Sequence, residues 1–409
     1  MSLKALWNPD NRDKLKNLCF SIGAGAIFNL VTQIVYIFFK NKMGVEAYGV
    51  AQTVLSVLAI TAGTFGYAVG CARLLGTEKN YTASGDYNRI LLAMGLLGSM
   101  IGIAYLFYVG LAGPLSVVFY CLLTFATMLR YYAEVEFKIS GDFFRYMIYY
   151  VLISVGYVAG LFFLRFSHGW MLTLLAGETL CLLYVAVRGS IFRRPFLKRT
   201  EHFSPILFSV GFLIASSLID NVTLHADRIL LLSITGDGAA VTVYYAASLV
   251  GKIVSMLTLP VNAILLSYLM RYKEGLSKRI WSVVVALAAA FGLVCFGGCM
   301  IVSPLLVKWF YSEVYEAARP YLAPAVLGQI FYFVSGVLMM ILLRFCGEKK
   351  QLIFNGIYAV IFFGAVAAGT LLGGLSGFIL SILLANAFRF AGAVIWGFLV
   401  AGKKEESNT

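Results

Sequence analysis

Residues 90–111 read ILLAMGLLGSMIGIAYLFYVGL, a run of 22 residues without a charged side chain. A helix of about 18 or more such residues is long enough to cross the hydrocarbon core of a membrane, which is about 30 Å thick. Eleven further apolar runs of sufficient length lie at 18–39, 50–74, 114–133, 146–166, 170–187, 205–234, 240–269, 281–306, 322–345, 352–372 and 376–400. We therefore predict an all-α integral membrane protein with 12 transmembrane helices.

The composition excludes an ordinary soluble domain. Of the 409 residues, 61% are hydrophobic and 12% are charged, whereas soluble domains carry about 25% charged residues. The connectors between the runs are short, and none has room for a soluble catalytic domain. The seven cysteines lie mostly within apolar runs, so we interpret them as small packed side chains and not as a disulfide framework.

The lysines and arginines gather in alternate connectors. If the N-terminus lies on the inner side, the inner segments hold 24 of them and the outer segments hold 5. Cytoplasmic loops of membrane proteins carry such an excess, so both termini are predicted to be cytoplasmic. This topology also explains the net charge of +13, and we expect no nucleic-acid partner.

The longest inner polar segment, residues 188–203, divides the chain into two halves. We predict an N-terminal six-helix lobe at 1–187, a cytoplasmic basic linker at 188–203 and a C-terminal six-helix lobe at 204–409. The linker places Phe192, Phe196 and Phe203 among basic residues, a pattern typical of a segment that lies on anionic lipid headgroups. A plain connector explains the same pattern.

Ionisable residues inside the runs are the first candidates for function, because each costs about 2.5–3.5 kcal/mol to insert into a membrane. Away from the ends of the runs, the second half carries six of them: Asp220, His225, Asp227, Arg228, Lys252 and Arg389. One interpretation is a buried ion pair, for example Asp227 with Lys252, that only fixes helix register. The other is a polar cavity, whose surplus of cations favours an anion. His225 and Asp220 are candidates to carry a coupling proton.

The polar residues of the first half are weaker candidates. Asn29, Gln33, Gln52 and Arg73 form a possible polar vestibule, and Glu178 is a third candidate for coupling. Amide side chains hydrogen-bond to sugar hydroxyls, but they also join helices to one another in lipid. Aromatic rings that are candidates to stack on sugars are those of Tyr244, Tyr245 and Tyr332.

Enzyme motifs are absent from the sequence. It contains no G-x-x-x-x-G-K-[S/T] phosphate loop, no H-E-x-x-H, no G-x-S-x-G and no Cys/His metal spacing. None of the three histidines, His168, His202 and His225, lies beside a plausible nucleophile. We therefore expect no catalytic residues, no metal and no cofactor.

Short segments in both halves resemble a known transporter superfamily. They are KMGVEAYG at 42–49, FGYAVGCAR at 65–73, ADRIL at 226–230, Gly236, and YYAAS at 244–248. In these segments and in its helix count, the chain resembles the multidrug/oligosaccharidyl-lipid/polysaccharide flippase superfamily. Within it, the chain is similar to the polysaccharide flippases of the O-antigen and capsule type.

The resemblance implies two six-helix bundles around a central cleft that alternates between inward-open and outward-open states. The implied substrate is an oligosaccharide on a polyprenyl pyrophosphate, moved to the outer leaflet of the bacterial inner membrane for cell-surface polysaccharide biosynthesis. Arg228, Lys252 and Arg389 would hold the pyrophosphate by charge-assisted hydrogen bonds, with Asp227 orienting them. Implied partners are the lipid-linked oligosaccharide, membrane lipids and components of a polysaccharide polymerase.

Two alternatives remain open, and a third does not fit the sequence. A cation-coupled multidrug extruder of the same superfamily typically uses a carboxylate in its first helix, where this chain has Asn29 and Gln33 and no acid. A major-facilitator transporter would show G-x-x-x-D-R-x-G-R-R between its second and third helices, and the sequence there does not fit. The other open alternative is a membrane enzyme or scaffold that transports nothing.

Overall fold

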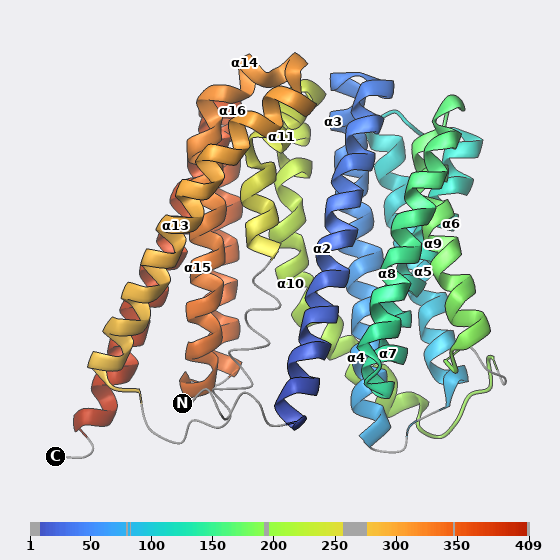
Figure 1. Cartoon of the computed structure of the whole chain (residues 1–409), viewed down its shortest axis with the longest axis horizontal. Helices are drawn as coiled ribbons and strands as arrows, with labels where there is room; N and C mark the ends of the chain where they lie inside the picture. Colours follow the sequence, from blue (N-terminus) through green and yellow to red (C-terminus); the bar gives the residue numbers. More distant parts are fainter. Residues whose placement is uncertain are drawn as a thin grey trace. The chain divides into compact units, whose positions relative to one another are not determined.

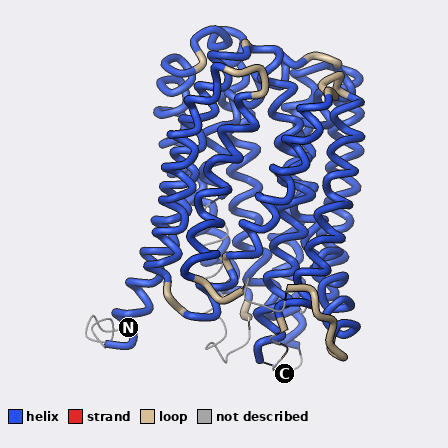
Figure 2. The backbone as a smooth tube through the Cα atoms, turned by 90° about the vertical axis from the view of Figure 1, so that its right-hand side faces the viewer, coloured by secondary structure: helices blue, strands red, loops and turns tan. Residues whose placement is uncertain are grey.

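The computed structural model describes residues 9–78, 81, 83–191, 196–256, 276–346 and 348–406 (Figure 1). Figure 2 shows helices joined by short loops, with no strand in these ranges. The α-helices are α2 (Pro9–Met43), α3 (Val45–Leu58), α4 (Thr64–Glu78), α5 (Ser84–Tyr108), α6 (Pro114–Ala133), α7 (Val135–Ser140), α8 (Phe143–Gly160), α9 (Gly169–Arg188), α10 (Phe203–Thr235), α11 (Gly238–Met256), α13 (Lys278–Phe310), α14 (Tyr315–Ala318), α15 (Leu322–Cys346) and α16 (Glu348–Glu406). The remaining described elements are a π-helix, η1 (Ala59–Gly63), and three 3-10 helices, η2 (Leu161–Arg165), η3 (Ser312–Val314) and η4 (Arg319–Tyr321).

The described helices account for the predicted membrane spans. Ten stretches are long and apolar enough to cross a membrane, and the pair Phe203–Ile219 and Asn221–Thr235, bent by 49°, adds one more. The stretch Lys350–Ala401 has 52 residues, far more than the roughly 20 that one crossing needs.

Helix α16 therefore has two arms, and the break between them is at Gly373 and Gly374. Gly374 has a φ of 54°, in the left-handed region that favours glycine because a Cβ would be strained there. Each arm is long enough to span, so the described helices include a stretch for each of the 12 predicted crossings. The predicted run 240–269 is described only as far as Met256, where α11 ends, and its remainder lies outside the described residues.

The helices pack into two compact units. Unit 1 comprises Met1–Gly44 and Thr53–Ala226, and unit 2 comprises Val45–Gln52 and Asp227–Thr409. These limits come from packing, and they divide helices α3 and α10 instead of falling in a connector. The lobes at 1–187 and 204–409 with their basic linker remain a prediction.

Small residues allow close helix contacts within unit 1. Gly156 and Gly160 of α8 lie against Gly177 and Thr173 of α9, where an added Cβ would collide with backbone atoms. The hydroxyl of Thr173 donates to the carbonyl of Gly160 at 2.8 Å. In lipid, van der Waals contact and such interhelical hydrogen bonds are the main attractions between helices, so these contacts stabilise the α8–α9 pair.

Unit 2 is built around α15, which packs against α11, α13 and α16. The core between these helices contains the buried side chains of Trp281, Phe333 and Leu338. The indole nitrogen of Trp281 donates to the carbonyl of Val394 at 3.0 Å, so this large ring is buried without an unsatisfied donor. This packing positions α11 and the second arm of α16, which carry Lys252 and Arg389.

Candidate functional site

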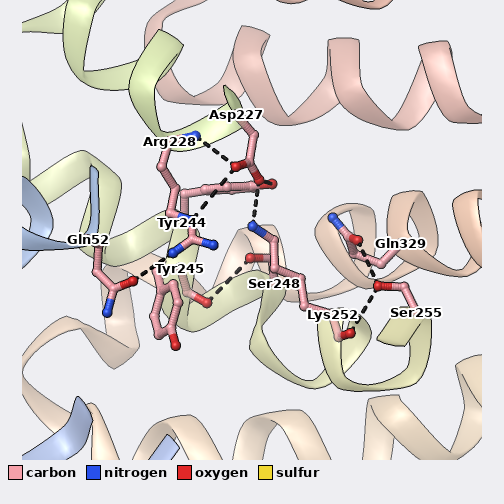
Figure 3. Close-up of polar contacts among 9 residues, drawn as sticks. All are labelled: Gln52, Asp227, Arg228, Tyr244, Tyr245, Ser248, Lys252, Ser255 and Gln329. Carbon is pink, nitrogen blue, oxygen red and sulfur yellow. Dashed lines mark hydrogen bonds and ion pairs between the residues drawn. The ribbon is translucent and has the colours of Figure 1, made fainter. Parts of the chain in front are cut away.

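A buried carboxylate, that of Asp227 on α10, organises the polar cluster of unit 2 (Figure 3). The ammonium group of Lys252 on α11 lies 2.5 Å from its Oδ2. The hydroxyl of Tyr244, two turns earlier on α11, donates to the same oxygen at 2.6 Å. Tyr244, Ser248 and Lys252 follow one another at four-residue spacing, so they share one face of α11, and this face lies against Asp227.

Arg228 extends the cluster in a second direction. Its backbone N–H donates to Oδ1 of Asp227 at 2.8 Å, and its guanidinium Nε lies 3.7 Å from the same oxygen. The guanidinium Nη1 donates to Oε1 of Gln52 at 2.7 Å, and the group lies over the ring of Tyr245, 5.3 Å from its centroid. The guanidinium of Arg228 is therefore held mainly by the amide of Gln52 and the ring of Tyr245, and its ion pair with the carboxylate of Asp227 is long.

Helix α3 supplies the next polar residues. Nε2 of Gln52 donates to the hydroxyl of Tyr48 at 2.8 Å, and that hydroxyl lies 3.2 Å from the hydroxyl of Tyr311. One turn away, Gly49 lies so close to the carbonyl of Gly238 that any side chain at position 49 would collide with it. The beginning of α3 is thus fixed within unit 2 by both hydrogen bonds and backbone contact.

The cluster carries more positive than negative charge. Arg228 and Lys252 are each 8% exposed and Asp227 is 3% exposed, so one carboxylate serves two buried cations. Burying a charge without full compensation is costly. The surplus makes this part of unit 2 more favourable for an anion than for a cation.

Arg389, on the second arm of α16, is the third predicted cation, and it is 7% exposed. Its guanidinium lies over the rings of Tyr332 and Tyr358, 4.6 and 4.8 Å from their centroids. Its Nε and Nη1 have no hydrogen-bond partner within the described residues. Tyr358 is held in place because its hydroxyl donates to Oδ1 of Asn386 at 2.6 Å.

The structure thus brings together four of the predicted site residues, namely Gln52, Asp227, Arg228 and Lys252. Across the described ranges, no hydrogen bond or ion pair joins Arg389 to these four. Joint binding of one pyrophosphate by all three cations therefore stays a prediction.

Other predicted site residues lie in unit 1. Arg73 is buried, and its guanidinium donates to the hydroxyls of Tyr132 and of Ser84 and to the carbonyl of Ile191. Asn29 and Gln33 are half-buried on α2, and His225 is half-buried on α10. The side chain of Asp220 lies outside the described residues.

Glu178 on α9 is almost fully buried, and its main partner is Arg130 on α6. The guanidinium Nε lies 3.0 and 2.9 Å from the two carboxylate oxygens. The hydroxyls of Tyr157 and Thr127 donate to the same carboxylate at 3.0 and 3.4 Å. This arrangement connects α6, α8 and α9, as a packing role requires.

The tyrosines have roles that the sequence did not indicate. Tyr244 was a candidate to stack on a sugar, but it is 1% exposed and donates to Asp227. Its spacing from Lys252, two helical turns on one face, was the signal that could have identified it as a partner of the carboxylate.

Within the described residues, no group of three or more His, Cys, Asp or Glu side chains could hold a metal ion.

Comparison with solved structures gives the same fold at low sequence identity. The chain is similar to lipid II flippase MurJ in an inward closed conformation, with a TM-score of 0.71 and 15% identity over 94% of this chain and 90% of that one. It is similar to a multidrug resistance MATE family transporter of the MOP superfamily in an inward-facing conformation, with a TM-score of 0.69 and 14% identity over 95% and 100% of the two chains. A MATE transporter of Vibrio cholerae in its bent form matches with a TM-score of 0.61 and 13% identity, over 95% of both chains.

These likenesses, all well below a quarter identical, concern the fold. The all-helical architecture with its multiple membrane spans is that of MATE transporters and of a lipid flippase. No protein-family model and no curated protein sequence matches the chain.

Proposed function

We propose that this protein is a flippase that moves an oligosaccharide linked to a polyprenyl pyrophosphate from the cytoplasmic to the outer leaflet. Its place would be the bacterial inner membrane, with both termini in the cytoplasm, and its product would feed cell-surface polysaccharide biosynthesis. The substrate class follows from the sequence resemblance, and Arg228, Lys252 and Arg389 are the proposed contacts for phosphate oxygens.

The observation that carries the proposal is the surplus of buried positive charge in unit 2. Asp227 compensates Lys252 at 2.5 Å but leaves the Arg228 guanidinium 3.7 Å away, and the guanidinium of Arg389 has two unpartnered nitrogens among the described residues. Guanidinium groups bind phosphate oxygens by short, charge-assisted hydrogen bonds, often two at a time. A phosphate-bearing headgroup would supply the negative charge that the described side chains lack.

The fold supports transport, because proteins with this architecture are transporters and a flippase. We expect no ATP hydrolysis, because the sequence has no G-x-x-x-x-G-K-[S/T] phosphate loop. We propose alternating access, in which the two units move relative to each other. Helices α3 and α10 run from one unit into the other, so such a motion has to deform them. Each has an irregularity suited to this: the π-helix Ala59–Gly63 directly follows α3, and α10 is bent by 49° between Ile219 and Asn221.

The test is reconstitution of the purified protein with a fluorescent polyprenyl-pyrophosphate oligosaccharide in vesicles, where an impermeant reagent reports the leaflet of the probe. We expect R389Q and R228Q/K252Q to reduce the rate of flipping at least tenfold, because each removes proposed phosphate contacts. The control is R319Q, which removes a charge at a side chain that is 68% exposed. Wild-type rates in both site variants would refute the assignment of the site.

The second candidate is a cation-coupled multidrug extruder, and buried acids in unit 1 favour it. Glu178 and Glu134 are 1% and 6% exposed, so unit 1 has buried carboxylates even though the apolar run 18–39 in α2 has no acidic residue. Vesicles loaded with a cationic dye and given a proton or sodium gradient distinguish the two. Dye efflux that E178Q abolishes, without flipping of the lipid-linked probe, would favour the extruder.

A further inference from the structure

The connection between α9 and α10 is held at two places in unit 1 by acidic side chains. Near its beginning, the carboxylate of Glu136 accepts the backbone N–H groups of Ser190 and Ile191 at 3.0 and 3.1 Å. Near its end, Asp86 accepts the N–H and the hydroxyl of Thr200 at 2.9 and 2.5 Å. Both acids therefore bind the backbone or a hydroxyl of the connection, although basic residues are close in sequence.

Residues 196–200, here called the strap, also follow the first turns of α5. The amide of Asn88 donates to the carbonyl of Phe196 at 2.9 Å, and Nε of Arg89 donates to that of Leu197 at 2.6 Å. At Gly85, a Cβ would collide with the backbone of Lys198. Such contacts fix the strap directly on α5, so its side chains have defined directions.

The strap exposes two apolar and two basic side chains in succession. Phe196 and Leu197 are each 50% exposed, and Lys198 and Arg199 are exposed as well. Among the described residues, neither Lys198 nor Arg199 has an ion-pair partner, and the Arg199 guanidinium lies over the ring of Phe203 at 4.8 Å. The result is a fixed surface with an apolar part next to a basic part.

The length of α5 places this surface at the membrane boundary. A 25-residue helix is about 37 Å long at 1.5 Å per residue, which exceeds a hydrocarbon core of about 30 Å. Residues 84–89 precede the uncharged run 90–111 and include Asp86, Asn88 and Arg89, so we infer that these first turns, to which the strap is bound, are the part in the headgroup layer. The excess of basic residues in this connection assigns it to the cytoplasmic side.

We propose that the strap binds anionic phospholipid headgroups of the inner leaflet, with Phe196 and Leu197 in the interface and Lys198 and Arg199 on the phosphates. Apolar side chains beside cations are the combination that holds a segment on an anionic membrane surface. An acidic protein partner would meet the cations but would leave the apolar pair exposed. This binding is independent of the substrate proposed above.

The test uses F196W in the full-length protein in nanodiscs that contain a minority of phosphatidylglycerol in phosphatidylcholine. Either lipid carries bromines, which quench a nearby tryptophan, and the quenching added by F196W over the parent protein is measured. Each basic residue near an anionic surface is worth about a fivefold preference, so the two together predict an enrichment of phosphatidylglycerol of up to about 30-fold. The enrichment should fall as salt is raised.

The matched variants are K198Q/R199Q and K278Q/R279Q, which remove the same charge from the strap and from the exposed beginning of α13. We expect only the strap variant to lose the enrichment. Equal quenching per molecule by the two lipids, absence of added quenching by either, or the same loss in both variants would each overturn the proposal. If a charge variant fails to fold, the salt series on F196W alone still tests the proposal, since an enrichment that salt does not reduce would contradict it.

Discussion

Replacing Asp227 by asparagine tests the charge balance of the cluster in unit 2. The substitution removes the carboxylate that lies 2.5 Å from the Lys252 ammonium, and both cations of the cluster are only 8% exposed. Breaking a buried pair by removing one partner costs about 3–5 kcal/mol, because the other charge is left uncompensated. Tyr244 can still donate to an amide oxygen, so we expect the lower end, about 3 kcal/mol.

The assay is thermal unfolding of purified D227N, K252M and D227N/K252M in detergent. A loss of about 3 kcal/mol corresponds to a fall in melting temperature of about 6–12 °C for a domain of about 150–250 residues, the size range of unit 2. Methionine keeps much of the length of lysine but carries no charge, so the double variant should recover most of the loss. The control is E316Q, at a side chain that is 81% exposed, which should change stability by no more than about 0.5 kcal/mol.

Two results would refute this account of the cluster. One is a melting temperature of D227N equal to that of E316Q, since the carboxylate would then compensate nothing. The other is a double variant as unstable as D227N alone, since the loss would then come from the asparagine and not from the stranded lysine.

Three further substitutions have outcomes that the packing determines. Arg389→Met should raise the free energy of unfolding by about 1 kcal/mol while it lowers flipping, because it removes buried donors that have no partner in the described structure; melting and flipping assays on one preparation check both. E178Q should cost about 3 kcal/mol and E178Q/R130M should recover most of it, as the melting temperatures of the pair will report. Gly49→Ala should cost about 1–3 kcal/mol by overpacking against Gly238, whereas Gly211→Ala, where the added methyl meets nothing, should not lower the melting temperature.

The sequence predicted the membrane spans because chain length and bilayer thickness determine them locally. The break at Gly373 and Gly374 was also predictable, since the apolar runs 352–372 and 376–400 are together too long for one crossing. The division of α3 between the units was not. The predicted run 50–74 continues across this boundary without a break, and only tertiary contacts such as that of Gly49 with Gly238 assign residues 45–52 to unit 2.

For the candidate site, a buried ion pair was predictable from the sequence where few residues of opposite charge were available. Asp227 with Lys252 was one of two interpretations of the sequence, and the structure contains this pair. The partner of Arg130 depended on which helices are neighbours, a property that periodicity does not encode. Glu178 in a different run is that partner, while Glu134 binds Lys138 and the hydroxyl of Tyr150.

The π-helix at Ala59–Gly63 makes the beginning of α3 a lever arm. From Gly63 back to Val45 the chain rises about 27 Å at 1.5 Å per residue, so a bend of only about 10° at the π-helix would sweep Val45 sideways by about 5 Å. Gln52, the residue that holds the Arg228 guanidinium, is carried on this arm. Because Val45–Gln52 is fixed within unit 2 together with Arg228, a modest angular change at this one turn would leave the bond between Gln52 and Arg228 intact.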